Sequence, residues 1–239
     1  MLDVFSSSIA FSEQDVRDKV VFVIDVLRAC STIHTALENG ANGIIPVAEN
    51  EDAGRYTRYL DPSSVLLCGE KEGKKVEGYH LGNSPLEYQQ DVVKNKTIIF
   101  KTSNGTRAIT RSSNARELYT GSFLNLSSMV DKIIEKDLSD VLLICSGWNS
   151  RLSIEDLLCA GAVIHRVYKS NLPQDAPDGV KVAFGLYEKF GAGLADLIAS
   201  SNHAKRLREL GNEQDIAYCC SMDVYQSLPR FHDGLLTIK

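Results

Sequence analysis

Long hydrophobic runs are missing from this sequence, as is any excess of positive charge. No apolar stretch reaches the length that spans a membrane, and the first residues lack the basic start and apolar core of a secretion signal. Its 26 Lys and Arg residues are outnumbered by 31 Asp and Glu residues, for a net charge of -5. We therefore expect a cytoplasmic protein with neither a membrane nor a nucleic acid as its partner.

Metal-binding spacings of cysteine and histidine are also missing. The six cysteines form no C-x-x-C pair, which argues against a zinc site and against a disulfide framework. None of the five histidines has a second histidine four residues away, so a structural role is expected for most of them. His203 starts a predicted helix, from which it could face a site.

Short apolar runs that end in small polar or charged residues are the main feature that is present. Such runs, each followed by a Gly, Ser or Asn turn and a helical pattern, are typical of buried parallel strands that lead into helices. We predict a three-layer α/β/α fold with a mostly parallel or mixed central sheet, and a ligand site at the carboxyl ends of its strands. The runs lie at 20–24, 65–68, 97–100 and 141–144.

The chain is predicted to form a single α/β domain over residues 1–239, with a possible subdomain boundary near 171–179. Beyond that stretch the pattern is mostly helical and too short for a core of its own, so these helices should pack back on the sheet. A polar helix is expected around 52–60. Ser84 to Glu87 reads as a capping box with proline at the first helical position.

The turn from Thr102 to Arg107 is a candidate anion cradle. It lies between a predicted strand and a predicted helix, where backbone N–H groups, hydroxyls, an amide and a guanidinium could converge on a phosphate. An ordinary turn with a helix cap explains the same residues. The turn lacks the Gly-Lys pair of a Walker A loop.

Carboxylates at strand ends are candidate ligands of Mg²⁺. Asp25 and Glu70 both close apolar strands, where a carboxylate has no packing value and is costly to desolvate without a partner. Glu155 and Asp156 open a helix beside a third strand end. Mg²⁺ prefers one or two carboxylates together with water and substrate oxygens. Ion pairs, such as Asp25 with Arg28, and ordinary helix capping are the alternatives.

A second candidate for phosphate chemistry lies after the fourth apolar run. Cys145 is followed six positions later by Arg151, which is the spacing of cysteine-dependent phosphatases. A nucleophilic Cys145 is therefore the runner-up mechanism, independent of metal. Ser146 and Gly147, in the same loop, are candidates for contacts to a substrate.

Five segments carry a family resemblance: Val23–Ala29, Leu81–Pro85, Thr102–Arg107, Gly121–Asn125 and Glu155–Gly161. In their order and spacing, from about Asp25 to Asp215, they resemble the 2-phosphosulfolactate phosphatase (ComB) family. The resemblance implies an α/β/α fold and Mg²⁺-dependent hydrolysis of 2-phospho-3-sulfolactate, or a similar small phosphorylated acid, to 3-sulfolactate and phosphate. That reaction is a step toward coenzyme M.

The resulting hypothesis is a phosphoric monoester hydrolase that binds Mg²⁺ through Asp25 with Glu70 or one acid of the Glu155 and Asp156 pair. Its alternatives are the cysteine enzyme and a protein that binds an anionic metabolite without turnover. The oligomeric state stays open, a homodimer included. We expect Arg107→Lys to be poorly tolerated. Asp25, Asn104 and Arg107 are the predicted catalytic residues, and the predicted substrate-binding residues are Arg28, Ser103, Gly105, Thr106, Ser146 and Gly147.

Overall fold

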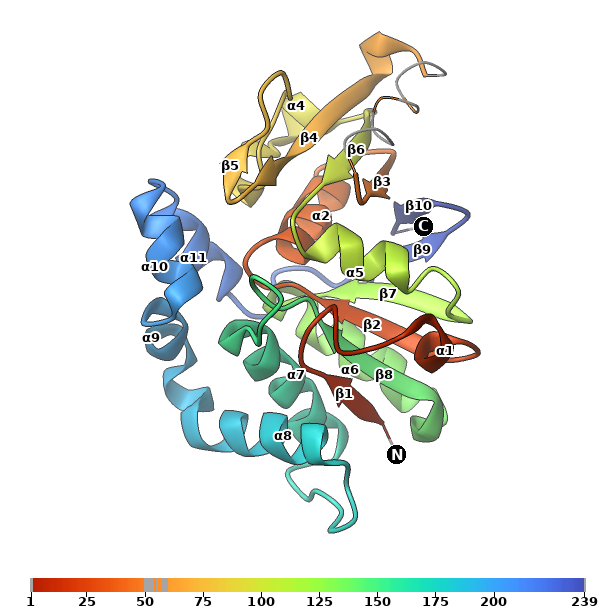
Figure 1. Ribbon diagram of the computed structural model, residues 1–239, viewed down its shortest axis with the longest axis vertical. Helices are drawn as coiled ribbons and strands as arrows, with labels where there is room; N and C mark the ends of the chain where they lie inside the picture. The colour runs from red at the N-terminus through yellow and green to blue at the C-terminus, as the bar shows by residue number, and fades with distance from the viewer. Residues whose placement is uncertain (1, 50–53, 55, 57–59, 239) are drawn as a thin grey trace.

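The computed structural model describes residues 2–49, 54, 56 and 60–238, and a mixed sheet runs through this part of the chain (Figure 1). The strands are β1 (Asp3–Phe5), β2 (Val20–Ile24), β3 (Gly43–Val47), β4 (Val65–Lys71), β5 (Lys74–Lys75), β6 (Thr97–Lys101), β7 (Glu117–Gly121), β8 (Val141–Cys145), β9 (Arg230–His232) and β10 (Leu235–Thr237). The α-helices are α1 (Glu13–Val16), α2 (Ala29–Glu38), α4 (Gln90–Val93), α5 (Gly105–Arg111), α6 (Leu126–Ile134), α7 (Ile154–Val167), α8 (Asp178–Phe190), α9 (Leu194–Ala199), α10 (Asn202–Glu209) and α11 (Glu213–Cys219). Short 3₁₀ helices are η1 (Pro62–Ser64), η2 (Pro85–Glu87), η3 (Phe123–Asn125), η4 (Leu138–Asp140) and η5 (Gly191–Gly193).

Two blocks of parallel strands make up the sheet, in the order β1-β8-β2-β7-β9-β10-β3-β6-β4-β5. The first block is β1, β8, β2 and β7, and the second is β3, β6 and β4. The hairpin of β9 and β10 pairs antiparallel with β7 on one side and with β3 on the other. The predicted mostly parallel or mixed sheet is therefore confirmed, although this hairpin was not predicted.

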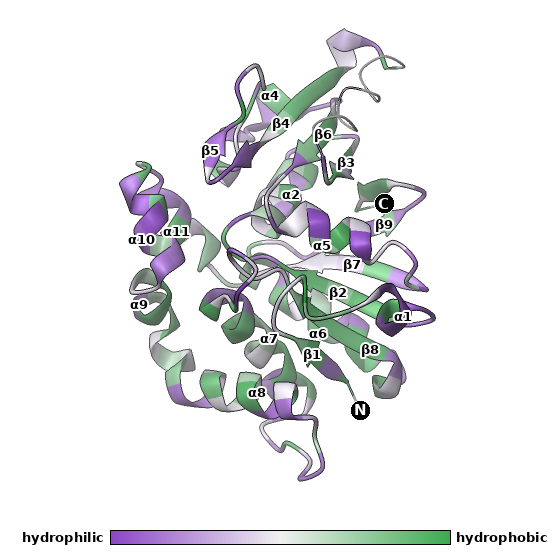
Figure 2. Cartoon of the chain, in the orientation of Figure 1, coloured by the Kyte–Doolittle hydropathy of each residue, from purple (hydrophilic) through white to green (hydrophobic). Residues whose placement is uncertain are grey.

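Strand β2 shows why its run of apolar residues is continuous. Val20, Phe22 and Ile24 enter the core on one face of the sheet, whereas Val21 and Val23 enter the core on the other face. Successive side chains of a strand point to opposite faces, so a strand covered on both sides needs apolar residues at every position. The apolar colouring accordingly concentrates on β2 and β8 in the interior of the molecule (Figure 2).

Helices cover both faces of the sheet and confirm the three-layer arrangement. The core on one face contains residues of α2, α4 and α5, and the core on the other contains residues of α6 and α7. The C-terminal helices α8 to α11 add to this second core, so they pack back as expected. In Figure 1 they line one side of the molecule and rise towards β5. The boundary near 171–179 stays a prediction.

Two local expectations have a different outcome. Residues Pro85 to Glu87 form only a 3₁₀ turn. The side chain of Glu87 accepts the N–H of Gly82 at 2.7 Å and the hydroxyl of Ser84 donates to Asp215 at 2.6 Å, so neither side chain caps this turn. The capping box is therefore wrong. The helix expected around 52–60 falls largely outside the described residues. No helix in the described part of the chain is both long and apolar enough to cross a membrane.

Candidate active site

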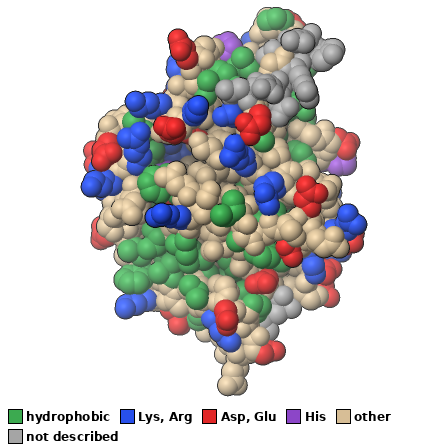
Figure 3. Space-filling view, in the orientation of Figure 1, with side chains coloured by type: hydrophobic (Ala, Val, Ile, Leu, Met, Phe, Trp, Pro, Cys, Tyr) green, Lys and Arg blue, Asp and Glu red, His purple; other side chains and the backbone are tan. Residues whose placement is uncertain are grey.

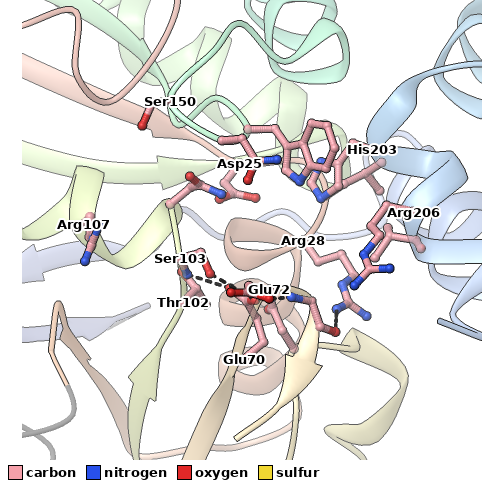
Figure 4. A pocket seen from close by; sticks show the side chains of 17 residues that line it. Asp25, Arg28, Glu70, Glu72, Thr102, Ser103, Arg107, Ser150, His203 and Arg206 are labelled. Carbon is pink, nitrogen blue, oxygen red and sulfur yellow. Dashed lines mark hydrogen bonds between the residues drawn. The ribbon is translucent and has the colours of Figure 1, made fainter. Parts of the chain in front are cut away.

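The carboxyl ends of strands from both blocks converge on one cavity of about 460 Å³ (Figure 4). Its walls include Asp25 after β2, Glu70 at the end of β4, Asn104 after β6, Trp148 after β8 and His203 on α10. The space-filling view shows Lys and Arg side chains gathered around a hollow in the upper part of this face (Figure 3). The arginines in the wall of this polar cavity, Arg28, Arg107 and Arg206, suit it to a small anionic ligand.

Asp25 is the buried carboxylate that faces this cavity. Its Oδ1 accepts the N–H of Ala29 at 3.0 Å, while Oδ2 has no hydrogen-bond partner among the described residues. Burial raises the pKa of Asp25 to about 6, against a lowering by His203 and by the Ala29 amide. A Cβ on Gly105 would come within 2.6 Å of Oδ2, so the segments that follow β2 and β6 touch here and a glycine is needed at their contact.

Glu70 connects the loops after β4 and β6. Its Oε1 accepts the N–H of Ser103 at 2.6 Å, and its Oε2 accepts the N–H of Gly73 at 2.6 Å. The Ser103 hydroxyl donates to Oε2 as well, at 3.2 Å. Both oxygens are thus engaged with the protein. Glu70 shapes the cavity wall, and less of its charge is left for a ligand.

Some backbone N–H groups of the Thr102–Arg107 turn donate hydrogen bonds to side chains of the same turn. The N–H of Thr102 donates to Thr106 Oγ1 at 2.9 Å, and the N–H of Thr106 donates back to Thr102 Oγ1 at 3.0 Å. Thr106 therefore closes the turn and does not line the cavity. The amides of Ser103 and Thr106 are therefore engaged within the protein, although Ser103 itself lines the cavity. Asn104 lines the cavity and makes no capping hydrogen bond.

The two candidate arginines differ sharply in burial. The Arg28 side chain is 3% exposed and forms an ion pair with Asp215 at 2.5 Å, and it also donates to the carbonyl of Gly73 at 3.3 Å. The Arg107 side chain is 53% exposed and pairs with the exposed Glu49 at 2.9 Å. Arg107 lines the same cavity as Asp25, but Figure 4 shows the two side chains well apart. Arg28 is therefore the guanidinium held rigidly in the cavity wall.

Asp156 and its neighbours lie behind the cavity. Asp156 accepts the N–H of Val26 at 2.8 Å and the N–H of Gly147 at 3.0 Å, so it connects the loops after β2 and β8. Burial, together with the charges of Asp25 and Glu155, raises its pKa well above the usual range. Asp156, Ser146 and Gly147 do not line the cavity. As candidates for direct ligand contact they are not brought to the site, because backbone groups occupy Asp156 and Ser146 is fully buried.

Glu155 contacts His203, the histidine that the sequence indicated could face a site. His203 Nδ1 lies 2.7 Å from Glu155 Oε1, and the imidazole ring stacks on Trp148 with ring centroids 5.3 Å apart. Glu155 Oε2 is buried and does not reach the cavity. His203 and Trp148, together with Arg206, line the cavity and were missed as site residues. For these three residues, the only indication in the sequence was that a predicted helix starts at His203.

Cys145 is poorly placed for nucleophilic attack. Its side chain is fully buried at the end of β8, and burial raises the pKa of its thiol well above the usual value. Arg151 is exposed and, like Cys145, does not line the cavity. A cysteine nucleophile needs an accessible thiolate. The geometry gives the cysteine alternative no support.

The carboxylates of the site suit a cation that takes most of its ligands from substrate and water. Among the described residues, no cluster of three or more His, Cys, Asp or Glu side chains is arranged to hold a metal. Mg²⁺ commonly binds one or two carboxylates and takes its other ligands from water and phosphate. Asp25, with one oxygen free at the cavity, fits that mode. The engaged oxygens of Glu70 and the buried Glu155 and Asp156 fit it less well.

A layered α/β fold with a buried carboxylate and a buried guanidinium in a strand-end cavity is typical of proteins that bind small anionic metabolites. The family model described as 2-phosphosulpholactate phosphatase matches residues 7–234, and the chain belongs to this family of phosphoric monoester hydrolases.

Curated relatives cover nearly the whole chain. A protein of Caldanaerobacter subterraneus subsp. tengcongensis is 38% identical over 98% of this chain and 97% of its own length. One from Thermotoga petrophila is 41% identical over 92% of each chain, and one from Clostridium novyi is 38% identical over 99% of each. Each of the three carries the name probable 2-phosphosulfolactate phosphatase.

Proposed function

We propose that this chain is a Mg²⁺-dependent phosphatase that hydrolyses 2-phospho-3-sulfolactate, or a small phosphorylated acid much like it, to the hydroxy acid and phosphate. The observation that carries the proposal is the convergence of Asp25, Arg28 and Asn104 on one cavity. The names of the relatives support the sulfonated substrate. A cavity of about 460 Å³ is large enough for an ester of this size.

Each residue of the site has a distinct part in this function. Asp25 would hold Mg²⁺ through Oδ2, and the bound ion would supply charge neutralisation at the phosphoryl oxygens. Arg28 presents a fixed guanidinium to an anionic group of the substrate, since Asp215 holds it in place without covering all of its N–H donors. Asn104 contributes an amide to orient the ester. Glu70 keeps the Ser103 loop in position.

Phosphate release with and without metal tests the proposal. The enzyme is treated with a chelator, desalted, and assayed on phosphorylated hydroxy acids that carry a carboxylate or a sulfonate, before and after Mg²⁺ is added back. We expect release only with Mg²⁺ and faster release from the sulfonated ester. Asp25→Asn should lower kcat by at least about 100-fold because it removes charge at the cation. The exposed Asp131→Asn is the matched control and should leave kcat unchanged.

Three outcomes would contradict the proposal. Full activity without Mg²⁺ that Cys145→Ser abolishes would establish the cysteine mechanism. Binding of the phosphorylated acids with no phosphate release across the panel would establish a binding protein. Unchanged kcat in a folded Asp25→Asn variant would remove Asp25 from its role.

A further inference from the structure

His203 reaches the cavity from α10, in the C-terminal helical segment. Two contacts define its position: Nδ1 lies 2.7 Å from Glu155 Oε1, and one face of the ring stacks on Trp148. The residue lines the same cavity as Asp25. Its Nε2 makes no hydrogen bond within the described part of the chain. In Figure 4, His203 lies on the same side of the cavity as Asp25.

The buried Glu155 restricts what this imidazole can do. The Glu155 side chain is 1% exposed and the His203 side chain 14% exposed, so the pair is shielded from water except at the cavity. A carboxylate at Nδ1 fixes the orientation of the ring and leaves Nε2 as the nitrogen that exchanges a proton with a ligand. Stacking on Trp148 prevents the ring from rotating away.

The geometry points to His203 as the general acid that donates the proton from Nε2 to the leaving oxygen of the phosphate ester. This inference rests on the proposed function. The ester of a hydroxy acid leaves as an alkoxide, which is a poor leaving group unless it is protonated as the P–O bond breaks. Asp25 lines the same cavity and is a separate group, which would hold the cation that neutralises charge on the phosphoryl oxygens.

The proton balance of the step is complete. When water attacks directly, it forms a new bond to phosphorus as the bond between phosphorus and the ester oxygen breaks. The ester oxygen takes the Nε2 proton and leaves as an alcohol, and His203 becomes neutral. The attacking water loses one proton to solvent, and solvent returns one to His203 after the products depart. No oxidant, reductant or further reactant is needed.

Leaving-group dependence tests this role. The wild type, His203→Gln and Glu155→Gln are assayed on an alkyl ester, glycerol 2-phosphate or 2-phospho-3-sulfolactate, and on p-nitrophenyl phosphate, whose phenolate leaves without protonation. We expect His203→Gln to lose about 100-fold or more in kcat on the alkyl ester, and only a few-fold on the aryl ester. Glu155→Gln should show the same selectivity with a smaller loss. The exposed His232→Gln is the control and should change neither rate.

The outcomes separate this inference from the proposed function. Equal losses on both esters, or no loss on either, in variants that retain the thermal unfolding midpoint would overturn the role of His203 while leaving the phosphatase intact. A wild type that releases phosphate from no ester would overturn both. If His203→Gln does not fold, the Glu155→Gln variant provides the test. An equal loss of kcat on both esters in that variant would also overturn the role of His203.

Discussion

Two arginines illustrate what a sequence reveals about single residues. Arg107 lies in an obvious candidate motif, yet its side chain is half exposed and pairs with Glu49 on the surface. Arg28 was predicted as a substrate-binding residue or as an ion-pair partner of Asp25, and it proves to be buried in the cavity wall against Asp215. The difference depends on Asp215, which lies 187 positions away in the chain and which no local pattern relates to Arg28.

Our first residue-scale prediction reverses the expectation for Arg107. Arg28→Lys should lower kcat/KM by at least about tenfold, because lysine cannot match the planar, fork-shaped donor set that contacts Asp215 and a ligand together. Arg107→Lys should change it by less than about threefold, since an exposed ion pair contributes little. Steady-state kinetics of both variants provide the measurement. A larger loss of kcat/KM in Arg107→Lys than in Arg28→Lys would show that Arg107 is the arginine that binds the substrate.

His203 shows why part of the site was out of reach of sequence reasoning. A lone histidine at a helix start has no distinctive spacing, and its partner Glu155 is 48 positions earlier on another helix. Glu155 itself reads as an ordinary acid in a first helical turn. Only the packing of α10 beside the strand ends brings the two together. Asp25 was predictable because a carboxylate that ends an apolar strand stands out locally.

At the scale of elements, strong local patterns were read correctly and weak ones were not. The apolar run of β2 was evident because both of its faces are buried. The hairpin of β9 and β10 was missed, although Asp233 and Gly234 at its turn are a typical hairpin pair and have positive φ angles of 49° and 82°. Its strands are only three residues each, too short for a clear alternation.

The contact between α7 and α8 supports a second prediction. A Cβ on Gly161 would lie 2.2 Å from the carbonyl oxygen of Ala183, so α7 and α8 approach too closely for any side chain there. Gly161→Ala should lower the free energy of unfolding by about 2 kcal/mol, as overpacking does. Gly185→Ala on α8 meets no atom within 4 Å and should raise it by about 0.5 to 1 kcal/mol.

Urea unfolding of both glycine variants supplies the measurement. The two substitutions add the same methyl group to neighbouring helices, so any difference in the free energy of unfolding reports the contact itself. Equal stabilisation by both would mean that α7 and α8 separate without cost.

At the scale of the whole molecule, stability should depend on a buried histidine that does not line the cavity. His34 on α2 is 1% exposed, contacts Ser227 at 3.0 Å and stacks on Tyr225. Burial lowers its pKa from the usual 6.5 to about 4. The unfolded chain therefore binds a proton at a higher pH than the folded chain does. This part of the stability is complete above about pH 6.5 and is lost as the pH falls towards 4.

The lowered pKa of His34 sets the size of this pH effect on stability. Stability should decline by about 3 kcal/mol between pH 6.5 and pH 4 from His34 alone. His34→Gln should show a flatter decline than the wild type in denaturant unfolding at pH 7.5, 6 and 5, and His232→Gln should follow the wild type. Parallel pH curves for wild type and His34→Gln would contradict the assignment.

The β9–β10 hairpin has a consequence for biosynthesis. Within the described residues, β7 and β3 pair with this hairpin and not with each other. Every other strand precedes the hairpin in the chain, so a ribosome delivers both parallel blocks before it delivers the piece that bridges them. Until then, the facing edges of β7 and β3 are open, and newly made copies are exposed to wrong pairing with one another at that stage.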